Sequence, residues 1–220
     1  MTALMSPASI PGRGAGRPLR VGVLASGEGT NLQALLDRVH GREATVVAVG
    51  SDQPGARALS RAQAAGVATA VFPRGSFPDR AARDAAIAGW LRVAGVELVV
   101  LAGYMQLLSP AFLAAFPQRV VNVHPALLPA FPGLHAIEQA LAYGVKVFGV
   151  TVHFVDEGVD SGPIIAQRAL ELPRPGSAAE VHAALQPLEH DLLSEVVGLI
   201  ARGVVHTDPE HPRRVLVASA

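Results

Sequence analysis

Cysteine is missing from this sequence of 220 residues, and its absence excludes several kinds of chemistry. Without thiols the chain forms no disulfide bonds and no thiolate zinc site, and it has no cysteine nucleophile. Long apolar runs are missing as well: nowhere do about eighteen apolar residues follow one another, so no membrane-spanning helix is expected. The N-terminal segment also lacks an apolar stretch of signal-peptide length. These absences favour a soluble, cytoplasmic protein.

An excess of positive charge is lacking too. Lysine and arginine together number 18, and aspartate and glutamate together also number 18. Binding to nucleic acid or to a membrane surface relies on a basic excess, so the neutral balance indicates neither partner. Any anionic ligand must therefore be held by a local arrangement of groups. Half of the residues are apolar, which excludes a disordered or fibrous chain, and the length favours one compact unit.

Short apolar runs alternate with segments of helical periodicity along the first part of the chain. The predicted strands are 19–25, 44–49, 67–71, 96–101 and 120–123, and the predicted helices are 31–39, 54–65 and 79–93. The fourth of these strands is almost entirely apolar, which is typical of a central parallel strand covered on both faces. The alternation predicts an α/β fold, with a Rossmann-like, doubly wound and mostly parallel sheet.

The pattern changes after residue 144. Two long β-like runs, 145–155 and 164–172, have no helix between them, so we predict an antiparallel addition at one edge of the sheet. Residues 1–18 are rich in proline, glycine, serine and arginine, and we interpret them as a disordered tail. Residues 19–220 are then expected to form a single domain, because no internal repeat or linker divides them.

Residues 177–201 predict a long amphipathic helix near the end of the chain. Ser177 at the expected N-cap and Glu180 three residues later form the pattern of a capping box. Gly203 is the expected end of the helix, and the tail that follows can add a small hairpin.

A glycine-containing loop, 26–31, follows the first predicted strand and leads into the first helix. Glycines let the backbone approach a ligand closely, and the free N–H groups of the first helical turn favour an anion. Thr30 and Asn31 can add side-chain donors. The loop lacks the Gly-Lys-Ser/Thr ending of a Walker loop and the third glycine of a dinucleotide fingerprint. A phosphate site and a plain strand-to-helix turn therefore both remain open.

Two polar side chains end the apolar strand 120–123. Asn122 and His124 are two residues apart, so strand alternation places them on one face, about 7 Å apart along the chain. Such groups are costly to bury without partners. A neutral amide beside an imidazole is suited to donating hydrogen bonds to the oxyanion of a tetrahedral intermediate. The alternative is a histidine satisfied by the backbone, but the Asn-x-His-Pro spacing at a strand end favours a functional pair.

An acidic loop lies between the two β runs. Asp156 and Glu157 fit a surface turn as well as a functional site, whereas Asp160 precedes residues 161–163, Ser-Gly-Pro, which would fix its direction. A carboxylate beside His124 would hold the imidazolium and, through a water molecule, pass a proton from an attacking amine to a leaving group.

The remaining histidines give weaker signals. His153 lies within a β run and fits either the core or the surroundings of a site, and His135 fits a helix cap. No group of histidine, aspartate and glutamate has the local spacing of a metal site, so no metal is predicted.

Four segments together resemble the phosphoribosylglycinamide formyltransferases, the folate-dependent family of purine synthesis. They are Ala-Ser-Gly-Glu-Gly-Thr-Asn-Leu-Gln at 25–33, Asn-Val-His-Pro-Ala-Leu-Leu-Pro at 122–129, Pro-Gly-Leu-His at 132–135 and Val-Asp-Ser-Gly-Pro at 159–163. The resemblance runs from about residue 19 to residue 203. It implies transfer of a formyl group from 10-formyltetrahydrofolate, the co-substrate, to the amine of glycinamide ribonucleotide, without a metal.

The resemblance also implies roles for individual residues. The implied catalytic residues are Asn122, His124 and Asp160. The residues implied for the nucleotide substrate are Gly29, Thr30, Asn31, Gln186 and Glu189. Those implied for the folate are Arg80, Met105, Gln106, Leu107, Leu108, Asn122, Asp156, Glu157, Gly158, Val159 and Asp160. Gln106 departs from the family pattern, in which arginine or lysine is common at that place, and this weakens any charge contact to the folate there.

Three alternatives remain at this point. A formyltetrahydrofolate hydrolase shares the fold and the trio, but that family usually carries a regulatory domain ahead of the catalytic one, which an eighteen-residue tail cannot supply. A methionyl-tRNA formyltransferase would need a basic tRNA-binding domain, whereas this chain is neutral. A non-enzymatic folate- or nucleotide-binding protein stays open because a fold does not establish an activity. The expected partners are small-molecule substrates, with a homodimer as a further possibility.

Overall fold

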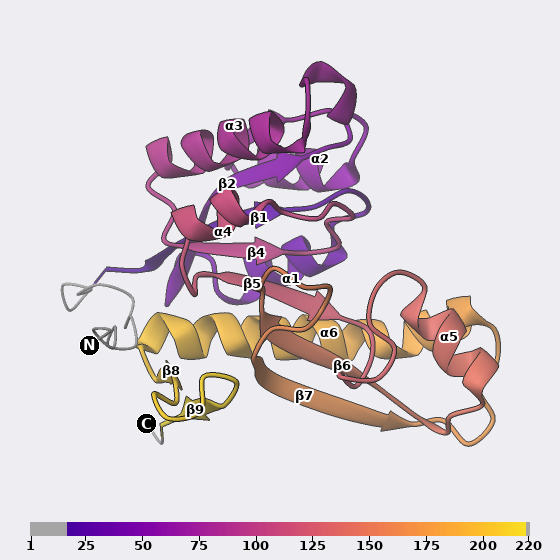
Figure 1. Ribbon diagram of the computed structural model, residues 1–220. Coiled ribbons are helices and arrows are strands. Elements are labelled where there is room, and N and C mark those ends of the chain that lie inside the picture. Colours follow the sequence, from indigo (N-terminus) through magenta and orange to yellow (C-terminus); the bar gives the residue numbers. More distant parts are fainter. Residues whose placement is uncertain (1–16, 219–220) are drawn as a thin grey trace.

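A computed structural model describes residues 17–218 of the chain (Figure 1). The predicted disordered tail, residues 1–18, lies almost wholly outside the described residues. Arg17 is described, and its guanidinium donates hydrogen bonds of 2.9 and 2.8 Å to the two carboxylate oxygens of Glu97.

Seven strands form one sheet in the order β3-β2-β1-β4-β5-β6-β7. Their bounds are β1 Leu19–Leu24, β2 Ala44–Ser51, β3 Ala68–Val71, β4 Leu98–Leu101, β5 Val120–His124, β6 Val147–Phe154 and β7 Ile164–Glu171. The strands from β3 to β5 in this order are parallel, β6 is antiparallel to β5, and β7 is antiparallel to β6. Both the doubly wound parallel sheet and the antiparallel edge addition after residue 144 are thus confirmed.

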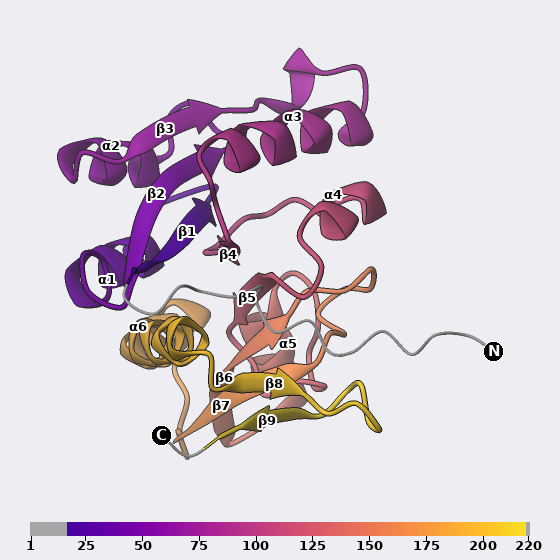
Figure 2. The same cartoon turned by 90° about the vertical axis from the view of Figure 1, so that its left-hand side faces the viewer.

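The helices cover both faces of the sheet. Their bounds are α1 Thr30–Arg38, α2 Arg57–Ala64, α3 Arg80–Val93, α4 Pro110–Ala115, α5 Ala136–Tyr143 and α6 Ala178–Arg202, with a short 3₁₀ turn at Arg74–Ser76. Figure 2 shows α1, α2 and α6 on one side of the sheet and α3 and α4 on the other. Within the described residues, no helix combines the length and the apolar composition that a membrane span requires.

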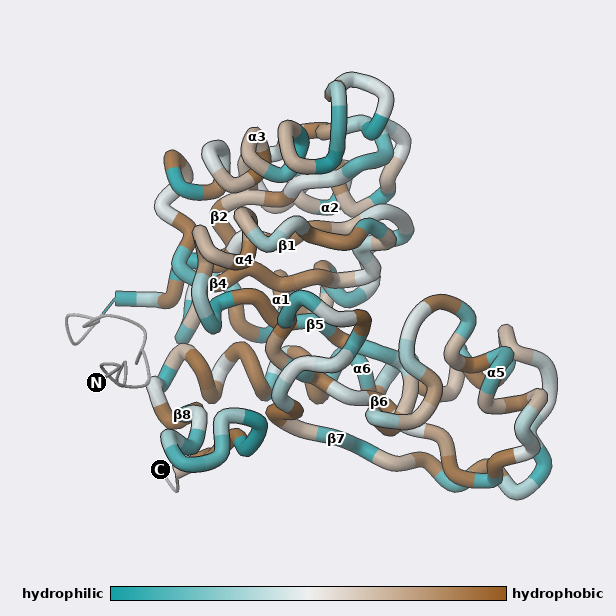
Figure 3. Tube along the Cα trace, in the orientation of Figure 1, coloured by the Kyte–Doolittle hydropathy of each residue, from teal (hydrophilic) through white to brown (hydrophobic). Residues whose placement is uncertain are grey.

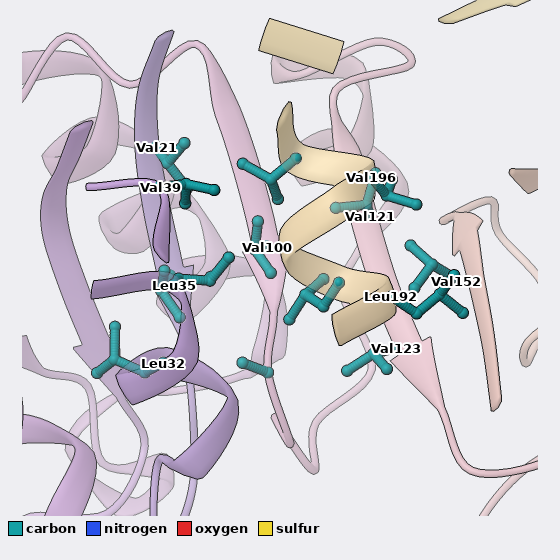
Figure 4. Close-up of a cluster of buried hydrophobic side chains, with 14 of the residues drawn as sticks. Val21, Leu32, Leu35, Val39, Val100, Val121, Val123, Val152, Leu192 and Val196 are labelled. Atoms are coloured by element: carbon teal, nitrogen blue, oxygen red, sulfur yellow. The ribbon is translucent and has the colours of Figure 1, made fainter. Parts of the chain in front are cut away.

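Each face of the sheet has its own hydrophobic core. One core lies under α1 and α6 and takes alternate residues of the strands, among them Val21, Val100, Val121 and Val123 (Figure 4). The other core lies under α3 and α4 and takes the intervening residues of the same strands, such as Leu24, Val99 and Val120. The alternation of side chains across a strand explains this division. Figure 3 shows hydrophobic stretches along the central strands.

The capping box at the start of α6 is present as predicted. The Glu180 backbone N–H donates to Ser177 Oγ at 3.3 Å, and the Ser177 backbone N–H donates to Glu180 Oε2 at 2.6 Å. Gly203 ends the helix in the left-handed conformation, with φ 73°. The expected small hairpin follows, as strands β8 Val205–Thr207 and β9 Val215–Val217.

Two short helices lie outside the predicted elements. Helix α4 spans six residues and α5 spans eight, so neither is long enough to show a clear apolar periodicity. The start of α4 does carry a local signal, because Ser109 is its N-cap and Pro110 its first residue. His135 stands at the N-cap of α5, although its side chain makes no capping hydrogen bond.

Candidate active site

The candidate site lies on the face of β5 and β6 that α6 does not cover. In the antiparallel pairing Asn122 lies opposite His153, and His124 lies opposite Thr151. These side chains therefore share one face, while the intervening valines of both strands point into the core under α6. Two loops, 125–135 and 155–163, contribute the groups that contact this polar face.

Asp160 brings the three predicted catalytic residues together. Its Oδ2 lies 3.3 Å from His124 Nδ1, and its Oδ1 accepts a hydrogen bond of 3.2 Å from Asn122 Nδ2. The carboxylate is largely buried, with 14% of its side chain exposed, and the His124 ring is 6% exposed. The predicted proximity of a carboxylate to His124 is present, and Asn122 joins both in one cluster.

His124 has an acceptor at each ring nitrogen. Its Nε2 lies 2.8 Å from the backbone carbonyl oxygen of Phe131. A carbonyl oxygen only accepts, so Nε2 carries a proton and donates it. The other nitrogen, Nδ1, faces Asp160, so the doubly protonated imidazolium satisfies both contacts. Phe131 itself has a φ of 53°, which is uncommon for a bulky residue, and its carbonyl is held over the histidine.

His153 completes the cluster from β6. Its Nδ1 lies 2.8 Å from the Phe154 carbonyl oxygen and therefore carries a proton. Its Nε2 lies 3.3 Å from Asn122 Nδ2 and 3.5 Å from Asp160 Oδ1. A neutral His153 accepts from the Asn122 amide, and a protonated His153 donates to Asp160. In either form the ring limits how Asn122 can turn.

The environment of Asp160 keeps its carboxyl ionised. Burial alone would raise the pKa, but the hydrogen bond with His153, the Gly133 backbone N–H at 2.8 Å and the charge of His124 together lower the pKa of Asp160 to about 2. Its backbone is left-handed, with φ 48°, a conformation that aspartate adopts more readily than most residues. Asp160 is thus an acceptor near neutral pH, suited to orienting an imidazolium.

The glycine-containing loop 26–31, to which the resemblance assigns the phosphate and ribose, has a backbone geometry that suits an anion. Gly29 has a φ of 70°, and a Cβ atom there would lie 2.7 Å from the Ala58 Cα atom, so glycine alone fits. Helix α1 begins at the next residue, and no side chain caps it. The N–H groups of its first turn therefore remain available to an anionic ligand.

The residues expected to face the nucleotide come together between α1 and α6. Asn31 Nδ2 donates to Glu189 Oε2 at 2.9 Å, and Gln186 Nε2 donates to Thr30 Oγ1 at 3.3 Å. Asn31 and Glu189 are both buried. Asn31 Oδ1 is buried too, without a hydrogen-bond partner in the described part of the chain. The side-chain amide of Asn31 is thus directed at Glu189 and positions that carboxylate.

The predicted folate residues fall into separate groups. Met105 and Leu107 are exposed on the loop after β4, where their apolar side chains can line a binding site. Leu108 packs against the core under α3 and α4. Arg80 is the first residue of α3 and is exposed, and among residues 17–218 its guanidinium makes no hydrogen bond or ion pair. In the described part of the chain, no hydrogen bond or ion pair links the Arg80 side chain to the other predicted residues.

The acidic loop before β7 is held by its own side chains. Asp156 Oδ1 accepts hydrogen bonds from Ser161 Oγ at 2.6 Å and from the Gly158 backbone N–H at 3.1 Å. Glu157 and Val159 are exposed. Asp156 therefore shapes the loop that carries Asp160. In the described residues, no group of three histidine, aspartate or glutamate side chains is arranged to hold a metal ion.

A sequence profile of formyl transferases matches residues 19–197, most of the length of the chain. The chain belongs to the formyl transferase family. The matched range includes every residue of the trio and both neighbouring loops.

Individual relatives agree with this assignment. The phosphoribosylglycinamide formyltransferase of Bacillus subtilis is 40% identical over 187 residues, which cover 82% of this chain and 96% of that protein. That of Mycobacterium tuberculosis is 44% identical over 185 residues, covering 84% and 86%. The crystal structure of glycinamide ribonucleotide transformylase 1 from Symbiobacterium toebii aligns with a TM-score of 0.87 at 45% identity, over 92% of this chain and 95% of that one. The resemblance inferred from the motifs is confirmed.

In this formyl transferase the Gln106 side chain points into the protein. Its Oε1 accepts from Arg83 Nη1 and its Nε2 donates to Asp52 Oδ2, both at 3.1 Å. Arg83 is also paired with Asp84 at 3.2 Å, and both are almost fully buried. Both ends of the Gln106 amide are thus occupied by contacts within the protein.

Two parts of the site were not predicted from the sequence. The sequence does not assign His153 to the core or to the site, because only the pairing of β5 with β6 places it opposite Asn122. The Arg83–Asp84 pair had an available signal: both residues lie on the same helical face as the buried Ile87, Ala88 and Leu91. Charged residues on an apolar helical face indicate buried partners.

Proposed function

We propose that this chain transfers the formyl group of 10-formyltetrahydrofolate to the amine of glycinamide ribonucleotide in purine biosynthesis, with Asn122, His124 and Asp160 at the reaction centre. The observation that carries the proposal is the simultaneous contact of Asp160 with Asn122 and His124. The names of the relatives, phosphoribosylglycinamide formyltransferase and glycinamide ribonucleotide transformylase, support the choice of substrates.

The proposed reaction is a direct attack of the substrate amine on the formyl carbon. The carbonyl oxygen becomes an oxyanion, and His124 Nε2–H donates to it after the oxyanion replaces the Phe131 carbonyl oxygen as acceptor. The amide of Asn122 is the second donor, after one of its N–H groups leaves Asp160 or His153. Collapse of the intermediate breaks the bond to the folate nitrogen, and a water beside Asp160 carries the proton from the attacking amine to that nitrogen. No covalent enzyme intermediate is needed.

The two substrates enter from different sides of the trio on this proposal. The first turn of α1, with Gly29, Thr30 and Asn31, receives the phosphate and ribose, and Glu189 faces the nucleotide. Exposed apolar side chains on the loops bordering the trio, Met105, Leu107 and Val159, receive the folate ring. Holding both substrates beside the trio supplies much of the rate through proximity.

The decisive assay follows the loss of 10-formyltetrahydrofolate with and without glycinamide ribonucleotide. Loss that requires the acceptor, with formylated nucleotide as product, supports the transferase. Loss of equal rate without the acceptor would identify a hydrolase instead, and binding without loss would identify a non-enzymatic binder. The Asp160→Asn variant is the matched control, since it removes the carboxylate and keeps the size of the side chain.

We infer small-molecule substrates alone as ligands of this site. A homodimer and a cytoplasmic location remain predictions from the sequence. Sedimentation equilibrium over a wide range of protein concentration tests the dimer: a mass that stays at one chain's 22.8 kDa contradicts it.

A further inference from the structure

The C-terminal hairpin contacts the loop that carries Asp160. Arg213, in the turn between β8 and β9, donates a hydrogen bond of 2.7 Å from Nη2 to the backbone carbonyl oxygen of Ser161. The next residue, Arg214, forms a β-bridge with Ile164, the first residue of β7. Figure 2 shows the hairpin lying beside β7, the edge strand of the sheet. The two residues of this hydrogen bond are 52 positions apart in the sequence. The hairpin thus contacts the chain at the residue that follows Asp160.

The hairpin turn is itself well fixed, so it can act as a support. Asp208 Oδ1 accepts the backbone N–H groups of Glu210 at 2.9 Å and His211 at 3.3 Å, and Asp208 Oδ2 lies 3.6 Å from Arg214 Nη1. The Asp208 backbone N–H donates to the Arg214 carbonyl oxygen at 2.8 Å. These contacts close the turn around Arg213 and limit the directions in which its side chain can leave the backbone.

Several contacts within the Asp160 loop constrain its conformation. Asp156 holds the Ser161 hydroxyl, and a Cβ atom on Gly162 would collide with the Phe154 carbonyl oxygen, so the chain passes close to β6 there. Asp160 itself is left-handed. The Ser161 carbonyl oxygen accepts its hydrogen bond from outside the loop, from Arg213. Without this hydrogen bond the Ser161–Gly162 peptide unit, which follows Asp160 by one residue, can rotate, and the segment that carries the Asp160 carboxylate loses one of its supports.

We propose that Arg213 is a positioning residue for the formyl transfer, which acts through the Ser161 carbonyl to hold Asp160 against Asn122 and His124. The inference rests on the proposed function, in which Asp160 is a catalytic residue. A charge-assisted hydrogen bond to a single peptide carbonyl fixes orientation without reaching the substrates. Sub-ångström misplacement of a reacting group is enough to lower a rate without changing the overall structure.

The test compares three variants in steady-state kinetics with both substrates. Arg213→Ala is expected to lower kcat about tenfold and to leave the KM for glycinamide ribonucleotide unchanged, because among residues 17–218 no backbone hydrogen bond links the nucleotide loop at 26–31 to the hairpin. Arg213→Lys is expected to recover most of the rate, since its ammonium can donate to the same carbonyl. Arg92→Ala, which removes an exposed guanidinium from the last turn of α3, is the matched control and keeps wild-type kcat.

Hydrogen–deuterium exchange gives a readout that does not depend on activity. In Arg213→Ala, exchange is expected to rise in peptides covering 156–163 and 129–135, because Asp160 also accepts the Gly133 N–H. Wild-type kcat and exchange in Arg213→Ala would overturn the inference. So would a loss of rate with unchanged exchange in both peptides. Asp160→Asn separates the two hypotheses: if it keeps full turnover the proposed function fails, whereas if it is inactive and Arg213→Ala is normal, only the positioning role fails.

Discussion

The two faces of strands β5 and β6 differ in what covers them, although neighbouring residues of the same strands form both. One face is apolar and packs under α6, and its members include Val121, Val123 and Val152. The other face is polar where two loops cover it, and its polar members are Asn122, His124, Thr151 and His153. A helix offers only side chains to the strands below it, whereas loops also offer carbonyl and N–H groups, here those of Phe131 and Gly133. The face under α6 therefore contributes to the stability of the fold, and the face under the loops carries the groups proposed for the chemistry.

Removing a reacting group from the polar face is expected to give the largest effect. His124→Ala and Asp160→Asn should each lower kcat on the order of a thousandfold, because they remove a donor to the oxyanion and the carboxylate that orients it. Nucleotide binding, measured by calorimetry, should survive in both. Turnover within tenfold of wild type in both variants would show that this face is not the reaction centre.

Truncating the apolar face should act on stability instead. Leu192 on α6 is almost fully buried against the valines of this face (Figure 4). Leu192→Ala should lower the free energy of unfolding by about 3 kcal/mol, through lost burial and the cavity left behind. Urea unfolding measures this change, and kcat at a temperature where the variant is fully folded should stay near wild type. A large loss of kcat in the folded variant would contradict the separation of the two faces.

The dependence of the unfolding free energy on acidic pH tests the contacts of Asp160 on the polar face. The folded state lowers the pKa of Asp160 from 3.8 to about 2, so folding favours the ionised carboxylate by about 2 kcal/mol. This contribution is fully present above about pH 4, the pKa range of an unfolded aspartate, and is lost as the pH falls through about 2. Between pH 5 and pH 2 the unfolding free energy of Asp160→Asn should therefore fall less than that of wild type. Parallel curves for the two proteins would contradict the assigned contacts.

Adjacent residues of β6 give the finest comparison. His153→Phe keeps a ring but removes the partner of the Asn122 amide, so kcat should fall about tenfold. Val152→Ala, one residue earlier and on the apolar face, should instead lower the unfolding free energy by about 2 kcal/mol with little change in kcat. Kinetics and urea unfolding on both variants check the pair. Equal effects of both variants on kcat would mean that His153 acts only through packing.

Much of the fold was predictable because its signals are local. The capping box of Ser177 and Glu180 places the start of α6 correctly. The start of α3 was set one residue early, at Asp79, which is its N-cap. Strand β4 begins at Leu98, two residues after the predicted start at Val96. The apolar run begins at Val96, but Val96 and Glu97 lie outside the strand. Boundaries of this kind depend on backbone pairing, which an apolar run does not specify.

The sequence by itself determined the alternation of strands and helices, the shared face of Asn122 and His124, and the glycine turn before α1, because each follows from periodicity or from the conformation of a few consecutive residues. Only the tertiary structure decided that Asp160 reaches Asn122 across 38 residues, that His153 lies opposite it, and that Arg213 supports the same loop. Strand register and loop direction set these contacts. A shift of β6 by one residue would move His153 into the apolar core, and no local pattern in either strand records which register forms.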